Sequence, residues 1–304
     1  MKKLISIIAF ALPLWGLAGS AQAQQAKVYF TKEITPESLV RIYDALGVKA
    51  HGQVAVKIST GESGGNNYLK PPLIRNLVEK VDGTIVECCT AYGGSRQDVK
   101  KHWATIHEHG FDSIFRVDIM DEEGDMQIPV KDSTWIKYDI VGNHLNKYDF
   151  CINLAHFKGH VMGGFGGVLK NQSIGFASSA GKGYIHSHGV TSKLPDAWQH
   201  TQPQDAFLES MAAAAQAIAD HFGKGNIVYI NVLNNISIDC DCDAHPHAPE
   251  IQDIGIVAST DPIACDRAAY DLIYQVKKDE NNNPDPLKQR IERQISRSDA
   301  VHGR

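Results

Sequence analysis

The sequence predicts an α/β protein with a mostly parallel sheet and flanking helices. Short runs rich in valine and isoleucine alternate with longer stretches whose apolar residues recur at helical spacing. This alternation is typical of repeated strand–helix units, which build a parallel sheet with helices on its faces. The chain has no internal repeat and no long linker. We therefore expect one compact domain over residues 24–296, and a division into two lobes stays open.

The first half of the chain supplies most of these units. Thr35 is expected to cap a helix that starts at Pro36, because proline fits the first helical turn. A second helix is expected over 71–81, and a third between a Ser95 cap and His109. The expected strands of this half are 26–30, 53–59, 84–89, one within 111–120, 135–141 and 149–154.

The second half contains the clearest helix, residues 205–222. Its alanine-rich centre favours helix, and Gly223 is a suitable residue to end it. The remaining expected elements are strands at 226–233 and 254–258, helices from 262 to about 276 and from 286 to 296, and a polar tail at 297–304.

The N-terminus carries the features of a secretory signal peptide over residues 1–23. A positively charged start precedes a short apolar run, and the small residues Ala21 and Ala23 form a cleavage signal before Gln24. A membrane anchor is the alternative, but the apolar run is short for a span. We expect a secreted or periplasmic protein with no stable membrane span after cleavage. The net charge of −5, with no basic stripe, argues against a nucleic-acid partner.

The richest segment for chemistry is 155–188. It follows an expected buried strand, where ligand sites of α/β sheets lie. His156, Lys158 and His160 alternate, so a continuing strand would point all three to one side, toward a metal or an acidic substrate. In the alternative, one histidine only ends the strand and Lys158 reaches solvent. Lys170, Lys182 and His186 add basic groups to the same segment.

The glycine run of this segment comprises Gly163, Gly164, Gly166 and Gly167. Its amides are candidates to bind an anion or a cofactor phosphate, with Lys170 adding charge. The alternative is a tight strand-to-helix turn. The run has neither the spacing of a Walker loop nor that of a dinucleotide-binding loop.

A second candidate group is the segment 239–243, Asp-Cys-Asp-Cys-Asp. In an extended chain, Cys240 and Cys242 face one way and the carboxylates the other. Two thiols with nearby imidazoles suit a transition metal such as iron, nickel or zinc. The carboxylates suit a hard cation or neutralise the lysines of 155–188. The third reading is a surface acidic turn with a redox-labile cysteine pair. We expect Cys240 and Cys242 to be poor disulfide partners for each other, although an exported chain meets oxidising conditions.

Beyond these patterns, the chain resembles the domain-of-unknown-function family numbered 362, whose members are often labelled uncharacterised iron–sulfur-centre proteins. The resemblance rests on FKGHVMGGFGGVLKNQSIGFAS (157–178), on Gly181, Lys182 and His186, on DCDC (239–242) and on DIGIVASTDPIACDRAAYDL (253–272). It implies an α/β fold. Many members carry an inserted ferredoxin-type segment after the position of His186, but residues 188–205 contain no cysteine. A ferredoxin-type cluster is therefore not expected in this chain.

Three functions remain open from the sequence. The first is a metal-dependent or redox-linked enzyme acting on a small anion, with catalytic Lys158, Lys170 and His186, and metal ligands among His156, His160, Cys240 and Cys242. Its glycine amides and Lys182 would hold the cofactor or substrate. The second is a non-enzymatic protein that binds a small anion or a metal. The third follows from a weaker resemblance to the lactate-racemase family, which implies a cofactor on Lys170 and a metal-binding His186.

Overall fold

The computed structural model describes residues 26–249 and 251–276. The expected signal peptide, the helix expected at 286–296 and the polar tail lie outside the described residues. Within them, no helix is both long and apolar enough to cross a bilayer.

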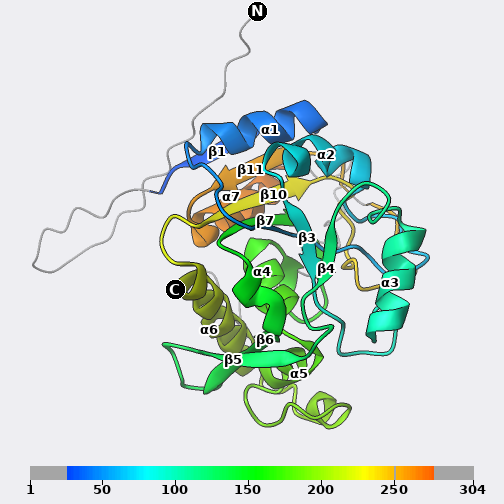
Figure 1. Cartoon of the computed structure of the whole chain (residues 1–304), viewed down its shortest axis with the longest axis vertical. Helices are drawn as coiled ribbons and strands as arrows, with labels where there is room; N and C mark the ends of the chain where they lie inside the picture. The colour runs from blue at the N-terminus through cyan, green and yellow to red at the C-terminus, as the bar shows by residue number, and fades with distance from the viewer. Residues whose placement is uncertain (1–25, 250, 277–304) are drawn as a thin grey trace, which may run out of the picture.

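A seven-stranded sheet forms the centre of the protein, in the order β1-β11-β10-β7-β2-β3-β4 (Figure 1). The five strands from β10 to β4 run parallel, and β11 pairs antiparallel with both β10 and β1. This confirms the predicted α/β class with a mostly parallel sheet. The strands are β1 (Val28–Thr31), β2 (Val54–Lys57), β3 (Thr84–Glu87), β4 (Val117–Ile119), β7 (Phe150–His156), β10 (Ile227–Leu233) and β11 (Gly255–Ser259).

Helices cover both faces of this sheet. The first face packs against α1 (Pro36–Ala45), α2 (Pro71–Lys80) and α3 (Val99–Glu108). The second packs against α4 (Val168–Phe176), α6 (Gln204–Phe222) and α7 (Pro262–Gln275). Side chains of β7 alternate between the two cores: Phe150 and Ile152 lie in the first, and Cys151 and Ala155 in the second. Burial on both faces explains why this strand is apolar without interruption.

Smaller elements complete the fold next to the second face. The hairpin of β5 (Asp125–Pro129) and β6 (Tyr138–Gly142) lies beside α5 (Ser179–His186), and β8 (Lys158–His160) pairs with β9 (Gly164–Gly166). Two short 3₁₀ helices occupy Asn143–Lys147 and Asp196–Gln199.

Two helix starts test the expected caps. Thr35 caps α1 as predicted, in a capping box with Ser38. The predicted Ser95 cap of α3 is wrong, because Asp98 accepts the hydrogen bond from the Lys101 amide instead. Instead, the amide and the hydroxyl of Ser95 both donate to the buried carboxylate of Glu62.

The parallel strands β2, β3 and β7 end at the same edge of the sheet. Their following loops therefore meet in one place, together with the loop after β10. In open α/β sheets, this edge is where ligands bind.

Candidate functional site

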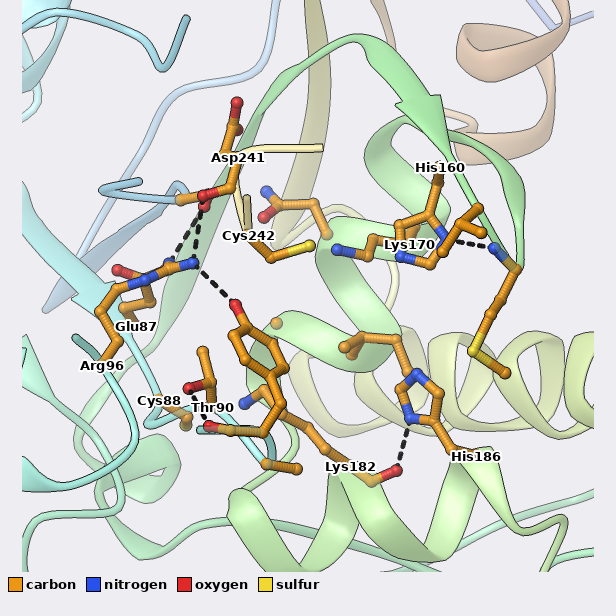
Figure 2. A pocket seen from close by; sticks show the side chains of 18 of the residues that line it. Glu87, Cys88, Thr90, Arg96, His160, Lys170, Lys182, His186, Asp241 and Cys242 are labelled. Atoms are coloured by element: carbon orange, nitrogen blue, oxygen red, sulfur yellow. Dashed lines mark hydrogen bonds and ion pairs between the residues drawn. The ribbon is translucent and has the colours of Figure 1, made fainter. Parts of the chain in front are cut away.

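A cavity of about 560 Å³ lies at this edge of the sheet. Its volume is in the range of small-molecule sites. Figure 2 shows Glu87 and Arg96 on one side of it and His160, Lys170 and His186 on the other. Cations outnumber carboxylates along the wall: Lys57, Arg96, Lys158, Lys170 and Lys182 stand against Glu87 and Asp241.

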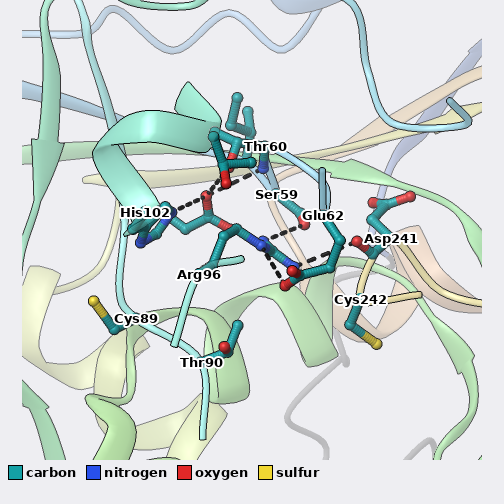
Figure 3. Close-up of polar contacts among 12 residues, drawn as sticks. Ser59, Thr60, Glu62, Cys89, Thr90, Arg96, His102, Asp241 and Cys242 are labelled. Carbon is teal, nitrogen blue, oxygen red and sulfur yellow. Dashed lines mark hydrogen bonds and ion pairs between the residues drawn. The ribbon is translucent and has the colours of Figure 1, made fainter. Parts of the chain in front are cut away.

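Arg96 is the cation with the most complete set of partners (Figure 3). Its guanidinium donates to Glu62 Oε1 at 3.0 Å, to Glu87 Oε1 at 2.5 Å and to the Asp241 carbonyl at 3.3 Å. Burial raises the pKa of Glu87, but Arg96 and His102 outweigh burial and hold that pKa well below its usual range. Arg96 therefore joins the loops after β2, β3 and β10 through compensated charges.

Asp241 neutralises two other basic groups. Its carboxylate accepts from Lys158 Nζ and from His156 Nδ1, both at 2.7 Å. The other His156 nitrogen lies 2.7 Å from the Asn234 carbonyl, so each ring nitrogen has an oxygen partner. Burial raises the pKa of Asp241, but His156 and Lys158 hold it far below its usual range. A carboxylate of 239–243 thus neutralises a lysine of 155–188, as predicted for one reading.

These contacts separate His156 from the other predicted metal ligands. Both of its ring nitrogens are engaged with oxygen acceptors. A metal would have to displace Asp241 or Asn234 to reach it. His156 and Lys158 act in this structure as partners of Asp241.

Lys170 differs from the other cations of the cavity. It lies in the first turn of α4, and its ammonium has no hydrogen-bond or ion-pair partner among the described residues. Burial, followed by the positive charge of Lys158, lowers the pKa of Lys170 to about 7. A cation is also unfavourable at a helix N-terminus, where the backbone dipole is positive. The negative charge of Asp241 acts in the opposite direction and offsets these effects only in part. The fold therefore holds an amine without an ion-pair partner among the described residues at the cavity wall.

The amides at the start of α4 are already occupied. Asp266, from α7, accepts from the amides of Val168 and Leu169 at 2.8 and 3.0 Å, and from Asn231 at 2.8 Å. A methyl group on Gly167 would collide with the Asp266 carboxylate. Because residue 167 is glycine, the Asp266 carboxylate can bind the N-terminal amides of α4. These amides were predicted from the sequence as candidates to bind a ligand.

The other predicted glycines have partners within the hairpin β8–β9. The Gly163 amide donates to His160 Nδ1 at 2.9 Å, and Gly164 and Gly166 lie in β9, paired with β8. Of the four glycines, Gly167 is the one that lines the cavity. The structure thus gives the glycine run the role of a tight connection from strand to helix.

Cys240 and Cys242 form a disulfide, which corrects the prediction that they are poor partners. The chain is not extended here. The Asp243 amide donates to the Cys240 carbonyl at 3.0 Å, and this turn brings the two Cα atoms to 5.2 Å, within the range of disulfides. One ligand atom from each of His160, Cys240 and Cys242 lies within 4.8 Å of the others. The two predicted halves of the site, 155–188 and 239–243, therefore meet.

His186 and Lys182 enter the cavity from α5. His186 Nδ1 donates to the Lys182 carbonyl at 2.6 Å, and its ring stacks on Phe207 with centroids 4.7 Å apart. Burial lowers the pKa of His186 to about 4, so the ring is neutral near pH 7 with Nε2 as an acceptor. Lys182 Nζ donates to the Ala177 carbonyl at 2.5 Å.

Sequence reasoning missed several residues of the cavity. Arg96 is a lone arginine in a loop, with no spacing that marks it. Lys57 is fully buried, and it donates to the Ile58 carbonyl at 2.5 Å and to Asn171 at 3.2 Å. A lysine at the end of an apolar strand was a usable signal, because such strands are covered on both faces.

Comparison with known proteins identifies the family. The family model described as "Domain of unknown function (DUF362)" matches residues 54–271. The chain belongs to this family. The predicted resemblance is therefore confirmed. No curated protein matches the chain significantly.

Two solved structures resemble this DUF362 chain. A Thermotoga maritima protein aligns with a TM-score of 0.50 and 13% identity, over 81% of this chain and 59% of that one. A lactate racemase apoprotein from Thermoanaerobacterium thermosaccharolyticum aligns with a TM-score of 0.41 and 14% identity, over 68% of this chain and 50% of that one. The chain thus spans about half to three fifths of these proteins. At such identity, the first likeness shows the fold alone.

Proposed function

We propose that this DUF362 protein is an exported enzyme that acts on a small organic anion, with Lys170 as the group that contacts it. One observation carries the proposal: among the described residues Lys170 has no ion-pair partner, in a cavity where Arg96 and Lys158 are paired with carboxylates. A bound carboxylate or phosphate would supply the missing counter-charge. The signal-peptide pattern of residues 1–23 supports the proposed export.

The same environment suits Lys170 for catalysis. An amine that titrates near neutral pH can donate or accept a proton at the pH where the protein works. The neutral His186 ring offers a second proton acceptor from α5. Lys158 is held by Asp241 and contributes positive potential. In this arrangement, Lys170 binds the anion or exchanges a proton with it, and His186 accepts a proton.

Binding is tested by thermal unfolding of the mature protein with a panel of small carboxylic acids and phosphorylated metabolites. We expect at least one acid to raise the Tm of wild type and of Lys131→Met, but not that of Lys170→Met. Lys131 is a matched control, because it is exposed and paired with Asp220 outside the cavity. Equal stabilisation of Lys170→Met, or no stabilisation by any acid, would contradict the proposal.

An enzyme is separated from a non-enzymatic binding protein by following the bound acid itself. NMR spectra of the stabilising acid, incubated with wild type and with Lys170→Met, report any chemical change. Conversion by wild type alone supports the enzyme. An acid that binds and stays unchanged supports the non-enzymatic alternative.

A second candidate is a metal-dependent enzyme, favoured by the convergence of His160, Cys240 and Cys242. Reduction of the disulfide would be required, because thiolates are the ligands. His160 Nδ1 accepts from the amides of Met162 and Gly163, which places the neutral ring's proton on Nε2. Metal binding by His160 would disturb this arrangement, so the sulfurs are the principal donors.

Elemental analysis of protein purified anaerobically with a reductant tests this candidate. We expect iron, nickel or zinc in wild type and a loss of that metal in Cys242→Ser. A folded, reduced and metal-free protein would overturn it. The lactate-racemase-like alternative predicts added mass on Lys170, which the intact mass of the native protein would reveal.

A further inference from the structure

The cavity has a basic floor and an apolar mouth. The floor contains Lys57, Lys158 and Lys182, each at most 6% exposed. The mouth is the more exposed part of the wall, residues 161–162 and 194–198, where Val161 is 65% exposed and Leu194 38%. In most proteins, apolar groups are buried and charged groups face water. The order of polarity from floor to mouth is therefore the reverse of the usual one.

The mouth also concentrates the exposed apolar groups of the protein. Among the residues that the structure describes, four large hydrophobic side chains are exposed, and two of them, Val161 and Leu194, line this cavity. Met162, Pro195 and Trp198 line it as well. Exposed apolar groups that gather at one opening are typical of ligand-binding sites. They indicate a ligand with an apolar part.

Two hydrogen bonds hold the mouth in place. The Gln204 side-chain amide donates to the Met162 carbonyl at 2.5 Å, which ties the turn between β8 and β9 to α6. The Trp198 indole donates to the Ala91 carbonyl at 3.3 Å, and its ring meets that of His186 edge-on, with centroids 5.1 Å apart. The mouth is therefore already formed without a ligand. A preformed surface loses little conformational entropy when a ligand binds.

The charges of the cavity match one negative group better than two. Arg96 and Lys158 are already paired with carboxylates of the protein, and Lys57 and Lys182 donate to backbone carbonyls. Lys170 remains as the contact for an anion. A second charged group on the same ligand would extend toward the apolar mouth. There it would lose part of its hydration without gaining a counter-charge.

We propose that the ligand is an amphipathic monocarboxylate, whose charged head lies at the floor and whose apolar tail contacts Leu194 and Val161 at the mouth. This inference rests on the proposed function, because it names the class of small anion that the same cavity takes. A cavity of about 560 Å³ lies in the range of sites for drug-sized ligands. An acid of two or three carbons would leave most of the apolar wall in contact with water. Leu194 is thus a specificity-determining residue for the tail.

The tail is tested by titration calorimetry of the mature protein with butanoate, hexanoate and octanoate. Burial of each added methylene should tighten binding by up to about fourfold. Suberate, which has the eight carbons of octanoate and a second carboxylate, should bind more weakly than octanoate. An affinity that does not change with chain length would overturn the inference, as would suberate that binds as tightly as octanoate.

The contact with the mouth has a matched pair of variants. Leu194→Asn removes an apolar side chain that is 38% exposed, and Ile114→Asn removes one that is 37% exposed and lies outside the cavity. Leu194→Asn should weaken the binding of octanoate about threefold or more and leave that of butanoate unchanged. Ile114→Asn should change neither affinity. Octanoate that binds Leu194→Asn as tightly as wild type would overturn the tail contact.

Lys170→Met separates this inference from the proposed function. Butanoate and octanoate that bind wild type equally, and both fail to bind Lys170→Met, would keep the anion contact and overturn the apolar tail. An affinity that rises with chain length equally in wild type and in Lys170→Met would keep the tail and overturn the contact of Lys170 with the anion. Absence of binding by all of these acids would overturn both.

Discussion

Arg96 and Lys170 line the same cavity and yet differ in almost every physical respect. Arg96 is 3% exposed and is held by Glu62 and Glu87. Lys170 has no ion-pair partner among the residues that the structure describes, and burial lowers its pKa to about 7. A cation whose charge is balanced within the protein holds loops together. A cation left without balance is available to a ligand.

The largest expected effect comes from removing Arg96, the cation whose charge is balanced within the protein. Arg96→Ala leaves the buried Glu62 and Glu87 without their counter-charge. Removal of one partner from a buried pair costs about 3–5 kcal/mol, so the free energy of unfolding in urea should fall by that amount. The matched control is Arg41→Ala, since Arg41 is 53% exposed in its pair with Glu33. Its cost should stay below about 1 kcal/mol. Equal losses for both variants would show that the Arg96 network is not a structural centre.

The next effect concerns the turn that places Lys170. In Gly167→Ala, the new methyl group collides with Asp266, which caps α4. Overpacking of this kind costs about 1–3 kcal/mol, measured as a lower free energy of unfolding. Gly93→Ala is the control, because its methyl group would meet Gln97 at an ordinary 3.7 Å. An unchanged stability of Gly167→Ala would argue against the close approach of Asp266.

The affinity for an anion should depend on pH through Lys170. The ammonium predominates below its pKa of about 7 and the neutral amine above it. Titration calorimetry with an acid that is fully ionised throughout should therefore give an affinity about tenfold lower at pH 8 than at pH 6. Lys131→Met should keep this dependence. An affinity that stays constant from pH 6 to pH 8 would exclude Lys170 as the binding group.

Lys170 also affects the pH dependence of stability. The pKa of Lys170 is lower in the folded protein than in the unfolded chain, so between about pH 7 and pH 10 the unfolded chain binds more protons. Wild-type stability therefore gains from this group as pH rises through that window. Lys170→Met should be more stable than wild type at pH 6, and the difference should shrink by pH 9.5. Urea unfolding at the two pH values checks this, and a difference that grows with pH would contradict the assignment.

The comparison also explains what the sequence could predict. Lys170 belongs to a segment dense in glycine and basic residues. Such a composition predicts a site from the sequence alone. Arg96 belongs to no pattern, because its partners Glu62, in the loop after β2, and Glu87, at the end of β3, meet only through the order of strands. Helices α4 and α5 escaped prediction for a related reason: their short, glycine-containing sequences give little helical periodicity.

The strands and long helices were predictable because burial on both faces imposes apolar runs, and because Thr35-Pro36 and Gly223 mark helix ends. The cap of α3 was not predictable, because Ser95 and Asp98 are both good capping residues. The contact of Ser95 with Glu62 leaves Asp98 as the cap. The meeting of 155–188 with 239–243 was predicted from chemistry. Its detail, a disulfide beside a neutralised Asp241, required the turn at Cys240–Asp243.

The antiparallel edge of the sheet has a consequence for how the protein reaches its native state. β1 finds its partner in β11, and the Ser259 hydroxyl donates to the Lys27 carbonyl across 232 residues. A contact over so long a loop carries a large entropic cost of closure and is typical of slow folding. During synthesis, β1 therefore emerges long before β11, the strand with which it pairs. A chain that stops before Gly255 would leave β1 without this partner.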